Sequence, residues 1–251
     1  MNDMIPRIIH YCWFGNNSKS LLIKKCIHSW EKNCPDYKIM EWSENNFDID
    51  EAPKYVLEAY KARKWAFVAD YVRFFVLLKY GGIYLDTDVE LLKPLDPFLR
   101  HNAFTGVEDN NYVNAAVIGC MKGYPLFQDF LSYYQNRSFY KEDGNMDMTT
   151  VVSIITGICK DRGYKNTDLY QEIDGMAIYP SEYFYPLSNV DKIMRKTEKT
   201  VAIHWFAGSW VPKEEKRKMR EFRRKKNMKY FFRKLMGQQR YDQVKKLLGR
   251  G

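Results

Sequence analysis

The sequence lacks long apolar runs, paired-cysteine motifs and glycine-rich nucleotide-binding loops. Its longest apolar runs, such as residues 74–78, are far too short to cross a bilayer. The five cysteines are odd in number and widely spaced, and none forms a Cys-x-x-Cys pair, so neither a zinc ribbon nor a redox pair is expected. The turn after the first expected strand has no Gly-x-Gly-x-x-Gly or Walker pattern, which argues against dinucleotide-binding and P-loop folds.

Composition indicates a globular protein. The chain has 251 residues, of which 45% are hydrophobic and 16% aromatic, enough for a sizeable core and too many for a disordered chain. Residues 1–10 contain no apolar segment typical of a signal peptide. The cysteines are expected to be reduced and buried, as in a cytosolic protein. We therefore expect a cytoplasmic location.

The net charge of +9 is concentrated at the C-terminus. Residues 213–251 carry 16 Lys/Arg and 4 Asp/Glu, a net of +12, whereas the remainder has 24 and 27, a net of −3. Apolar and aromatic side chains punctuate this basic segment, which predicts amphipathic helices suited to an anionic membrane surface. Alternatives are a terminal helix that packs one face on the body, and nucleic-acid binding, for which no recognition motif is present. We expect a domain over residues 1–212, a basic helical tail over 213–251, and no nucleic-acid partner.

The hydrophobic pattern alternates between short strands and longer helices, which predicts an α/β domain. Strands are expected at residues 8–13, 37–42, 83–85, 89–92, 103–107, 113–120 and 201–206. Helices are expected at residues 18–33 with Ser18 as N-cap, 53–63 with Pro53 in the first turn, 65–80, 124–136 and 148–160.

Two carboxylates follow the expected strand 83–85. Asp86 and Asp88 are two residues apart, and side chains at i and i+2 of an extended segment point the same way. Ligands of open α/β sheets bind at the carboxyl ends of strands, and paired carboxylates suit Mg²⁺ or Mn²⁺. The pattern alone is weak, because Asp48-Ile49-Asp50 repeats it in a polar stretch expected to form a solvated turn.

Other candidate residues have a structural and a functional reading. Trp13, at a strand end, could stack on a nucleobase or belong to the core. Asp70 and Arg73 are i and i+3 on an apolar helix, so they form either a surface ion pair or a partly buried, functional one. Asn114 must be hydrogen-bonded if buried, to backbone or to a sugar. His204 is either a metal or phosphate ligand or a structural histidine.

Three stretches together resemble glycosyltransferase family 32, which is distantly related to the clostridial glucosylating toxins. The first is Ile5-Pro6-Arg7-Ile8-Ile9-His10-Tyr11-Cys12-Trp13-Phe14-Gly15. The second runs from Ala69-Asp70-Tyr71-Val72-Arg73 to Tyr80-Gly81-Gly82-Ile83-Tyr84-Leu85-Asp86-Thr87-Asp88, and it is the most specific. The third is His204-Trp205 with Gly208-Ser209-Trp210. The resemblance covers roughly residues 5 to 211 and leaves out the tail.

The resemblance implies a GT-A fold, retention of anomeric configuration and dependence on Mn²⁺ or Mg²⁺. Asp88 would bind the metal directly, and Asp86 would contact the metal, the ribose or the sugar. Asp70 and Arg73 would hold the sugar and the ribose–phosphate portion of the donor. The toxins carry a carboxylate near the metal in the C-terminal loop, whereas this chain offers His204, whose imidazole is compatible with Mn²⁺.

The same resemblance implies the remaining donor-binding residues. Trp13 would stack on the uracil, with Cys12 beside it in the same stretch, and Tyr84 corresponds to the tyrosine before the metal motif. Asn114 would reach the donor sugar. Ser209 and Trp210 correspond to a loop that closes on the diphosphate.

We therefore expect a cytoplasmic enzyme, peripheral on the inner face of the membrane. It would transfer a sugar from a nucleotide-diphosphate donor, which the resemblance implies is UDP-linked, to a lipid-linked or growing glycan such as capsule or O-antigen. No residue is required as a nucleophile, so departure and attack on the same face are favoured over double displacement. Alternatives are a protein acceptor with the same donor site, and a non-catalytic binding protein whose basic tail contacts a partner or nucleic acid.

Overall fold

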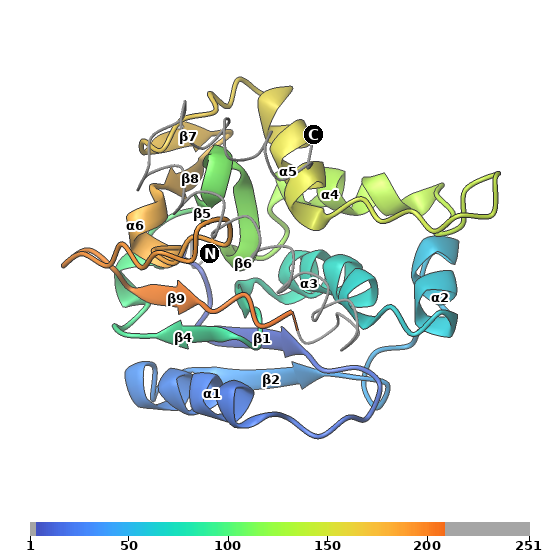
Figure 1. Ribbon diagram of the computed structural model, residues 1–251, viewed down its shortest axis with the longest axis horizontal. Helices are drawn as coiled ribbons and strands as arrows, with labels where there is room; N and C mark the ends of the chain where they lie inside the picture. The colour runs from blue at the N-terminus through green and yellow to red at the C-terminus, as the bar shows by residue number, and fades with distance from the viewer. Residues whose placement is uncertain (1–3, 209–251) are drawn as a thin grey trace, which may run out of the picture. The chain divides into compact units, whose positions relative to one another are not determined.

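The computed structural model describes residues 4–208, which build a seven-stranded mixed sheet in the order β2-β1-β3-β6-β5-β8-β7 (Figure 1). Its strands are β1 Ile8–Cys12, β2 Lys38–Trp42, β3 Gly82–Leu85, β5 Ala103–Val107, β6 Val113–Cys120, β7 Gln171–Ile173 and β8 Met176–Tyr179. A separate two-stranded sheet pairs β4 Val89–Leu91 with β9 Ala202–His204. The expected fold class, a mixed central sheet flanked by helices, is confirmed.

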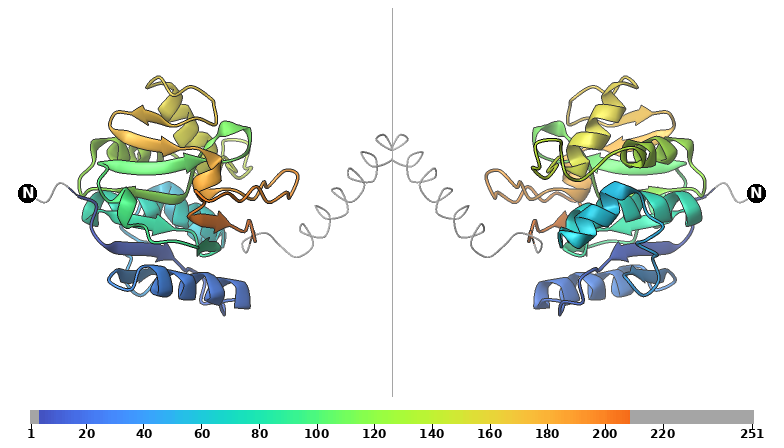
Figure 2. Two further views of the ribbon diagram at one scale, coloured as in Figure 1. Left: turned by 90° about the vertical axis from the view of Figure 1, so that its left-hand side faces the viewer. Right: turned by 90° about the vertical axis from the view of Figure 1, so that its right-hand side faces the viewer.

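Helices cover both faces of the large sheet (Figures 1 and 2). On one face lie α2 Lys54–Lys61, α3 Trp65–Tyr80, α4 Pro125–Gln135 and α5 Val151–Lys160. On the other lie α1 Leu21–Asn33, the β4–β9 sheet and the short α6 Ser181–Phe184. Single 3-10 turns occur at Asp96–Phe98 and Asp109–Asn111. None of the helices described between residues 4 and 208 is long and apolar enough to cross a membrane.

The β3 strand lies between two cores, which explains its uninterrupted apolar sequence. Ile83 and Leu85 point into the core with α1, and Tyr84 points into the core with α3. The turn from α3 into β3 requires glycine twice, since Gly81 has φ 68° and Gly82 has φ 106°. A Cβ on Gly82 would lie 2.7 Å from the carbonyl oxygen of Ile8. This tight turn sets where β3 ends.

Most of the expected elements are present, and the differences concern caps and long-range pairing. The N-cap of α1 is Ser20 rather than Ser18, because the Ser20 hydroxyl accepts the Ile23 N–H. Pro53 is the residue before α2 and not within its first turn. The expected strand 89–92 exists as β4 but leaves the main sheet to pair with β9.

Residues 161–200 contain structure that the sequence pattern did not predict. The short elements β7, β8 and α6 span three or four residues each, too few to show a period. All five cysteines are free and buried, as expected. The predicted boundary at residue 212 and the tail over 213–251 lie outside the described residues.

His10 of β1 is a buried neutral histidine whose two ring nitrogens are both satisfied. Its Nε2 donates to the carbonyl of Gly81 at 2.9 Å, and its Nδ1 accepts the indole N–H of Trp42 at 3.1 Å. A second proton on Nδ1 would break the Trp42 bond. Burial lowers the pKa of His10 to about 4, against an effect of the Gly81 carbonyl that raises it.

We expect His10 to make folding stability fall as the pH drops from about 6.5 to 4. The unfolded histidine takes up a proton below its ordinary pKa, whereas the folded one does so only near 4, so acid favours the unfolded state. The loss should approach about 3 kcal/mol at the lower end of this range. Urea unfolding of the wild type and His10→Gln at several pH values measures it. The matched control is His28→Gln, on an exposed histidine of α1. An unchanged acid slope in His10→Gln would contradict the assignment.

Candidate active site

The Asp86–Asp88 segment forms a turn at the carboxyl end of β3. The Asp86 N–H donates to the Ala116 carbonyl at 2.8 Å, and the Val89 N–H donates back to the Asp86 carbonyl at 2.9 Å. The two carboxylates converge with His204, with ligand atoms of all three within 4.8 Å of one another. Convergence is as expected, but it arises from a turn and not from the extended geometry that the spacing suggested.

His204 reaches this turn through the small sheet. Antiparallel pairing of β4 with β9 sets His204 opposite Val89, so its Nε2 lies 3.3 Å from Oδ1 of Asp88. Oδ2 of Asp88 accepts the Ala207 N–H at 2.7 Å. The pairing that brings the two together joins segments more than 110 residues apart.

The charges of this cluster shift one another's pKa values. Burial lowers the pKa of His204, but Asp88, Asp86 and Glu108 together raise it above its ordinary value. Burial raises the pKa of Asp88, but His204 and the Ala207 N–H bring it below its ordinary value. The carboxylates therefore favour a positive charge at this point, from a proton or from a cation.

Arg73 joins the α3 helix to the turn. Its Nη2 lies 2.9 Å from Oδ1 of Asp70 and 3.3 Å from Oδ1 of Asp86, and its Nη1 donates to the Ala115 carbonyl at 2.9 Å. Both Asp70 and Arg73 are buried, so the reading of a partly buried pair is correct and the surface ion pair is not. Burial raises the pKa of Asp70 to about 7 despite the neighbouring guanidinium. Arg73 thus shares its charge between two carboxylates.

Tyr84 and Cys12 form the floor beneath this ion pair. The Arg73 guanidinium lies over the Tyr84 ring, 4.7 Å from its centroid. Cys12 ends β1, the strand beside β3, and its thiol hydrogen-bonds with the Tyr84 hydroxyl. Burial raises the pKa of Cys12 to about 12, so the thiol stays neutral. A buried neutral thiol is a poor nucleophile, so the role left to Cys12 is to pack beneath the site.

Asn114 lies near the start of β6, and both the oxygen and the nitrogen of its amide are hydrogen-bonded. Its Oδ1 accepts the Ala116 N–H at 2.7 Å, and its Nδ2 donates to Oε2 of Glu108 at 2.6 Å. The expected backbone hydrogen bond is therefore present, together with one to a carboxylate. In this arrangement Asn114 orients the Glu108 side chain.

Glu108 is a site residue that sequence reasoning missed. Burial raises its pKa, whereas His204 and the Asn114 amide act to lower it. It directly follows β5, which runs antiparallel to β6 as β3 does, so β3 and β5 end at the same edge of the sheet. The signal was available, because a carboxylate comes just after each strand. What the sequence did not give was the relative direction of the strands.

Trp13 lies just beyond β1, half-buried at the same sheet edge. Its indole N–H donates to the Asn17 carbonyl at 2.7 Å, and Lys19 Nζ lies 5.4 Å from the ring centroid. It is therefore neither a fully buried core residue nor a free surface one. Ser209 and Trp210, the expected diphosphate loop, lie outside the described residues.

The second Asp-x-Asp copy is the solvated turn that was expected. Asp48 and Asp50 are exposed, and Oδ1 of Asp48 accepts the Asp50 N–H at 3.0 Å. These carboxylates serve a local turn. The two copies therefore share the Asp-x-Asp spacing but differ in flanking sequence and in tertiary surroundings.

The donor set of Asp86, Asp88 and His204 fits a divalent cation. Two carboxylates and an imidazole within 4.8 Å supply hard oxygen ligands and one nitrogen, which suits Mn²⁺ or Mg²⁺. Three protein ligands would leave coordination positions for the oxygens of a phosphorylated ligand. The raised pKa of His204 has the same origin, because the surrounding carboxylates attract positive charge.

Residues 21–105 match the family described as "Glycosyltransferase sugar-binding region containing DXD motif". This segment is similar to a glycosyltransferase sugar-binding region. It runs from α1 to β5 and contains the Asp70–Arg73 pair and the Asp86–Asp88 turn. Trp13, Glu108, Asn114 and His204 lie outside the matched residues. They belong to the candidate site by position alone.

Several whole proteins that are similar in sequence to this chain are named as glycosyltransferases. Inositol phosphoceramide mannosyltransferase 3 of Schizosaccharomyces pombe is 35% identical over 128 residues, which are 49% of this chain and 35% of that protein. An uncharacterized glycosyltransferase of Acanthamoeba polyphaga mimivirus is 27% identical over 234 residues, 83% of this chain and 85% of that one. The chain spans between 33% and 40% of the length of three yeast relatives. The solved PaToxG glycosyltransferase overlays with a TM-score of 0.49 and 19% identity, covering 63% of this chain and 70% of that one.

Proposed function

We propose that this chain is a retaining, metal-dependent glycosyltransferase. It moves a sugar from a nucleotide-diphosphate donor, UDP-linked in the first instance, to a lipid-linked or growing surface glycan. The observation that carries the proposal is the convergence of Asp86, Asp88 and His204 at the carboxyl end of β3, next to a buried Arg73. The sugar-binding region contains three of these four residues.

Breaking a sugar–phosphate bond leaves new negative charge on the nucleoside diphosphate. A divalent cation held by Asp86, Asp88 and His204 would supply the compensating charge for the leaving group. Arg73 holds Asp86 in place through the 3.3 Å contact and adds fixed positive charge beside it. Trp13 offers an aromatic ring at the same sheet edge, suited to a nucleobase.

The sugar would be held on the side of the site formed by α3, β5 and β6. Asp70 and Glu108 carry carboxylate oxygens there, and Asn114 fixes the direction of Glu108. Hydroxyl groups of a sugar hydrogen-bond well to such oxygens. Retention proceeds by departure and attack on one face, so no side chain of the chain has to form a covalent bond to the sugar.

The acceptor is proposed to be lipid-linked. Several relatives are named as mannosyltransferases or synthases of inositol phosphoceramide species, which are lipids with a phosphorylated headgroup. These names also make a mannosyl donor the main competitor to a UDP-sugar. For this chain we propose a cytoplasmic location, peripheral on the inner face of the membrane, with residues 213–251 contributing basic charge.

We expect UDP with Mn²⁺ to raise the melting temperature, and the effect to vanish with EDTA. A ligand at about 100 times its dissociation constant adds about 2.7 kcal/mol, which is about 5–10 °C for a chain of this size. The measurement is a thermal-shift panel of UDP, GDP, CMP and their sugars, each with Mn²⁺ or EDTA. A response to GDP in place of UDP would assign a GDP-mannose type of donor. A cooperative melt that no nucleotide shifts would contradict the proposed function.

Donor hydrolysis without acceptor separates an enzyme from a binding protein. A transferase that activates the sugar–phosphate bond should release the nucleoside diphosphate slowly into water when no acceptor is present. A binding module with the same donor site should give the thermal shift and no release.

A further inference from the structure

Residues 187–196 form a hairpin that carries three exposed apolar side chains. Val190, Ile193 and Met194 are 60%, 55% and 38% exposed, three large apolar side chains within five residues. Scattered exposed apolar residues are ordinary, whereas a cluster on a projecting segment marks an interaction site. We call this segment the 187–196 hairpin.

Hydrogen bonds within the hairpin fix its conformation. Leu187 and Met194 form an antiparallel bridge, and the Ser188 N–H donates to the Ile193 carbonyl at 3.1 Å. The Ser188 hydroxyl accepts the N–H groups of Val190 and Asp191, each at 3.1 Å. These hydrogen bonds within the segment order the turn, and the ordered turn holds the apolar side chains at the surface.

The hairpin is attached to the rim of the candidate active site. Asp109, which follows Glu108, accepts the N–H groups of Asn189 at 2.5 Å and Val190 at 3.0 Å. On the other side, Lys192 Nζ lies 5.3 Å from the centroid of the Phe206 ring, which is 4.0 Å from that of His204. In Figure 2 the hairpin is the orange loop that projects beyond the sheets beside β9.

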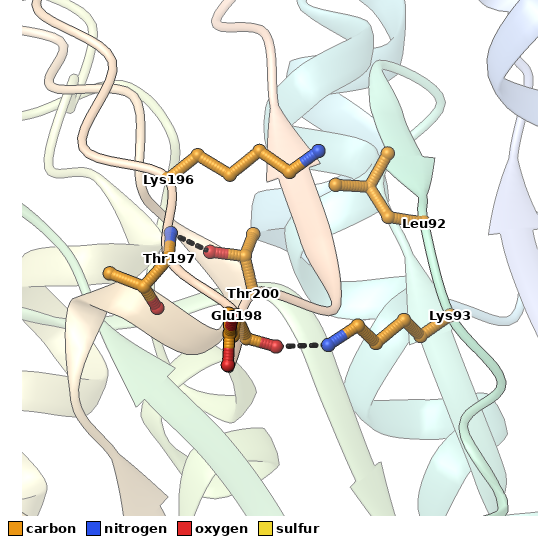
Figure 3. Close-up of a pocket in the computed structure, with 6 residues that line it drawn as sticks. All are labelled: Leu92, Lys93, Lys196, Thr197, Glu198 and Thr200. Carbon is orange, nitrogen blue, oxygen red and sulfur yellow. Dashed lines mark hydrogen bonds between the residues drawn. The ribbon is translucent and has the colours of Figure 1, made fainter.

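The hairpin and its base are basic. Lys192, Arg195 and Lys196 outnumber Asp191, which pairs with Arg195. The chain after the hairpin forms one wall of an open cleft of about 840 Å³ opposite the end of β4 (Figure 3). Lys196 lines one wall of this cleft and Lys93 the other. Lys93 and Lys196, with Glu198 between them, thus flank the base of a hairpin that carries exposed apolar side chains. Lysines beside apolar side chains are the combination suited to anionic phosphate headgroups above acyl chains.

We propose that the 187–196 hairpin docks onto an anionic membrane surface. Val190, Ile193 and Met194 enter the interfacial region, and Lys196 contacts lipid phosphates. Docking would hold the rim of the site, at Asp109 and Phe206, against the layer in which a lipid-linked substrate resides. Binding to lipid requires neither donor nor catalysis, so it can be tested apart from the proposed transfer reaction.

A fluorescent label at the tip tests insertion directly. All five native cysteines are buried, so a thiol-reactive, polarity-sensitive dye on the full chain carrying Ile193→Cys reports on that position alone. Vesicles of equimolar phosphatidylcholine and phosphatidylserine should shift its emission to the blue with a severalfold rise in intensity. Labelled Leu169→Cys, on a residue that is 67% exposed outside the hairpin, is the matched control and should not respond. Equal responses at the two positions, or none at position 193, overturn the proposal.

Vesicle sedimentation of unlabelled full-length variants separates the apolar and basic contributions. Replacing Val190, Ile193 and Met194 by Ser should lower partitioning about tenfold or more, because their burial in the interface is lost. Lys196→Gln should lower partitioning onto the anionic vesicles about fivefold and leave partitioning onto phosphatidylcholine vesicles unchanged. Unchanged partitioning in the triple variant overturns membrane docking. A dye response that follows protein concentration without lipid also overturns it, and would indicate that a second copy of the chain occupies the hairpin. In each variant, an unchanged thermal shift with nucleotide and Mn²⁺ shows that the donor site is intact.

Discussion

Asp88→Asn is expected to reduce sugar transfer about a thousandfold and to abolish the Mn²⁺-dependent nucleotide response. Its carboxylate is one of three groups placed to hold the cation, and it is also the partner that sets the charge of His204. Loss of a metal that stabilises a leaving group removes several kcal/mol of transition-state stabilisation. The measurements are donor turnover with Mn²⁺ and the nucleotide thermal shift. The fold should persist, because the amide oxygen can still accept the Ala207 N–H.

The second Asp-x-Asp copy supplies the matched control. Asp50→Asn makes the same chemical change in an exposed turn, and transfer and nucleotide response should remain at the wild-type level. A folded Asp88→Asn protein that keeps more than half of the wild-type transfer activity would contradict the assignment of Asp88 as a metal ligand. Equal losses in the two variants would show that the assay reports general negative charge and not a site.

Arg73→Met is expected to lower the free energy of unfolding by about 3–5 kcal/mol, as measured by urea unfolding at neutral pH. Both Arg73 and its partner Asp70 are buried, with side chains only 5% and 10% exposed. Removing one member of a buried ion pair leaves the other charge in a poorly polarisable interior. The Ala115 carbonyl also loses its donor.

Two further variants decide whether buried charge is the cause. Asp70→Asn combined with Arg73→Met removes the isolated carboxylate and should recover part of the stability. Arg7→Met disrupts an ion pair with Asp96 in which both side chains are about half-exposed, and it should have little effect. If the double variant is no more stable than Arg73→Met alone, lost packing and not uncompensated charge explains the change.

The sequence by itself determined the local elements of this protein. The apolar helix 65–80 has the same bounds as predicted. An apolar segment of sixteen residues with few charges is too long for an ordinary strand, so it predicts a helix. The strands 103–107 and 113–120 were likewise recoverable, since each is a mostly apolar run whose residues are all buried. The sequence also predicted which elements carry Asp70, Arg73 and the Asp86–Asp88 pair, because the helix, the two glycines and the strand follow one another directly.

Only the tertiary structure decided which chemical groups meet. Nothing local marks His204 as a neighbour of Asp88, because β4 and β9 are brought together by pairing across the whole domain. Glu108 joins the site because β5 and β3 run in the same direction, which depends on how β6 is inserted between them. The 187–196 hairpin shows no helix or strand period, and its exposed tip follows from contacts with Asp109 and Phe206. Local sequence fixes backbone conformation, whereas the meeting of distant charges depends on the global packing that buries them.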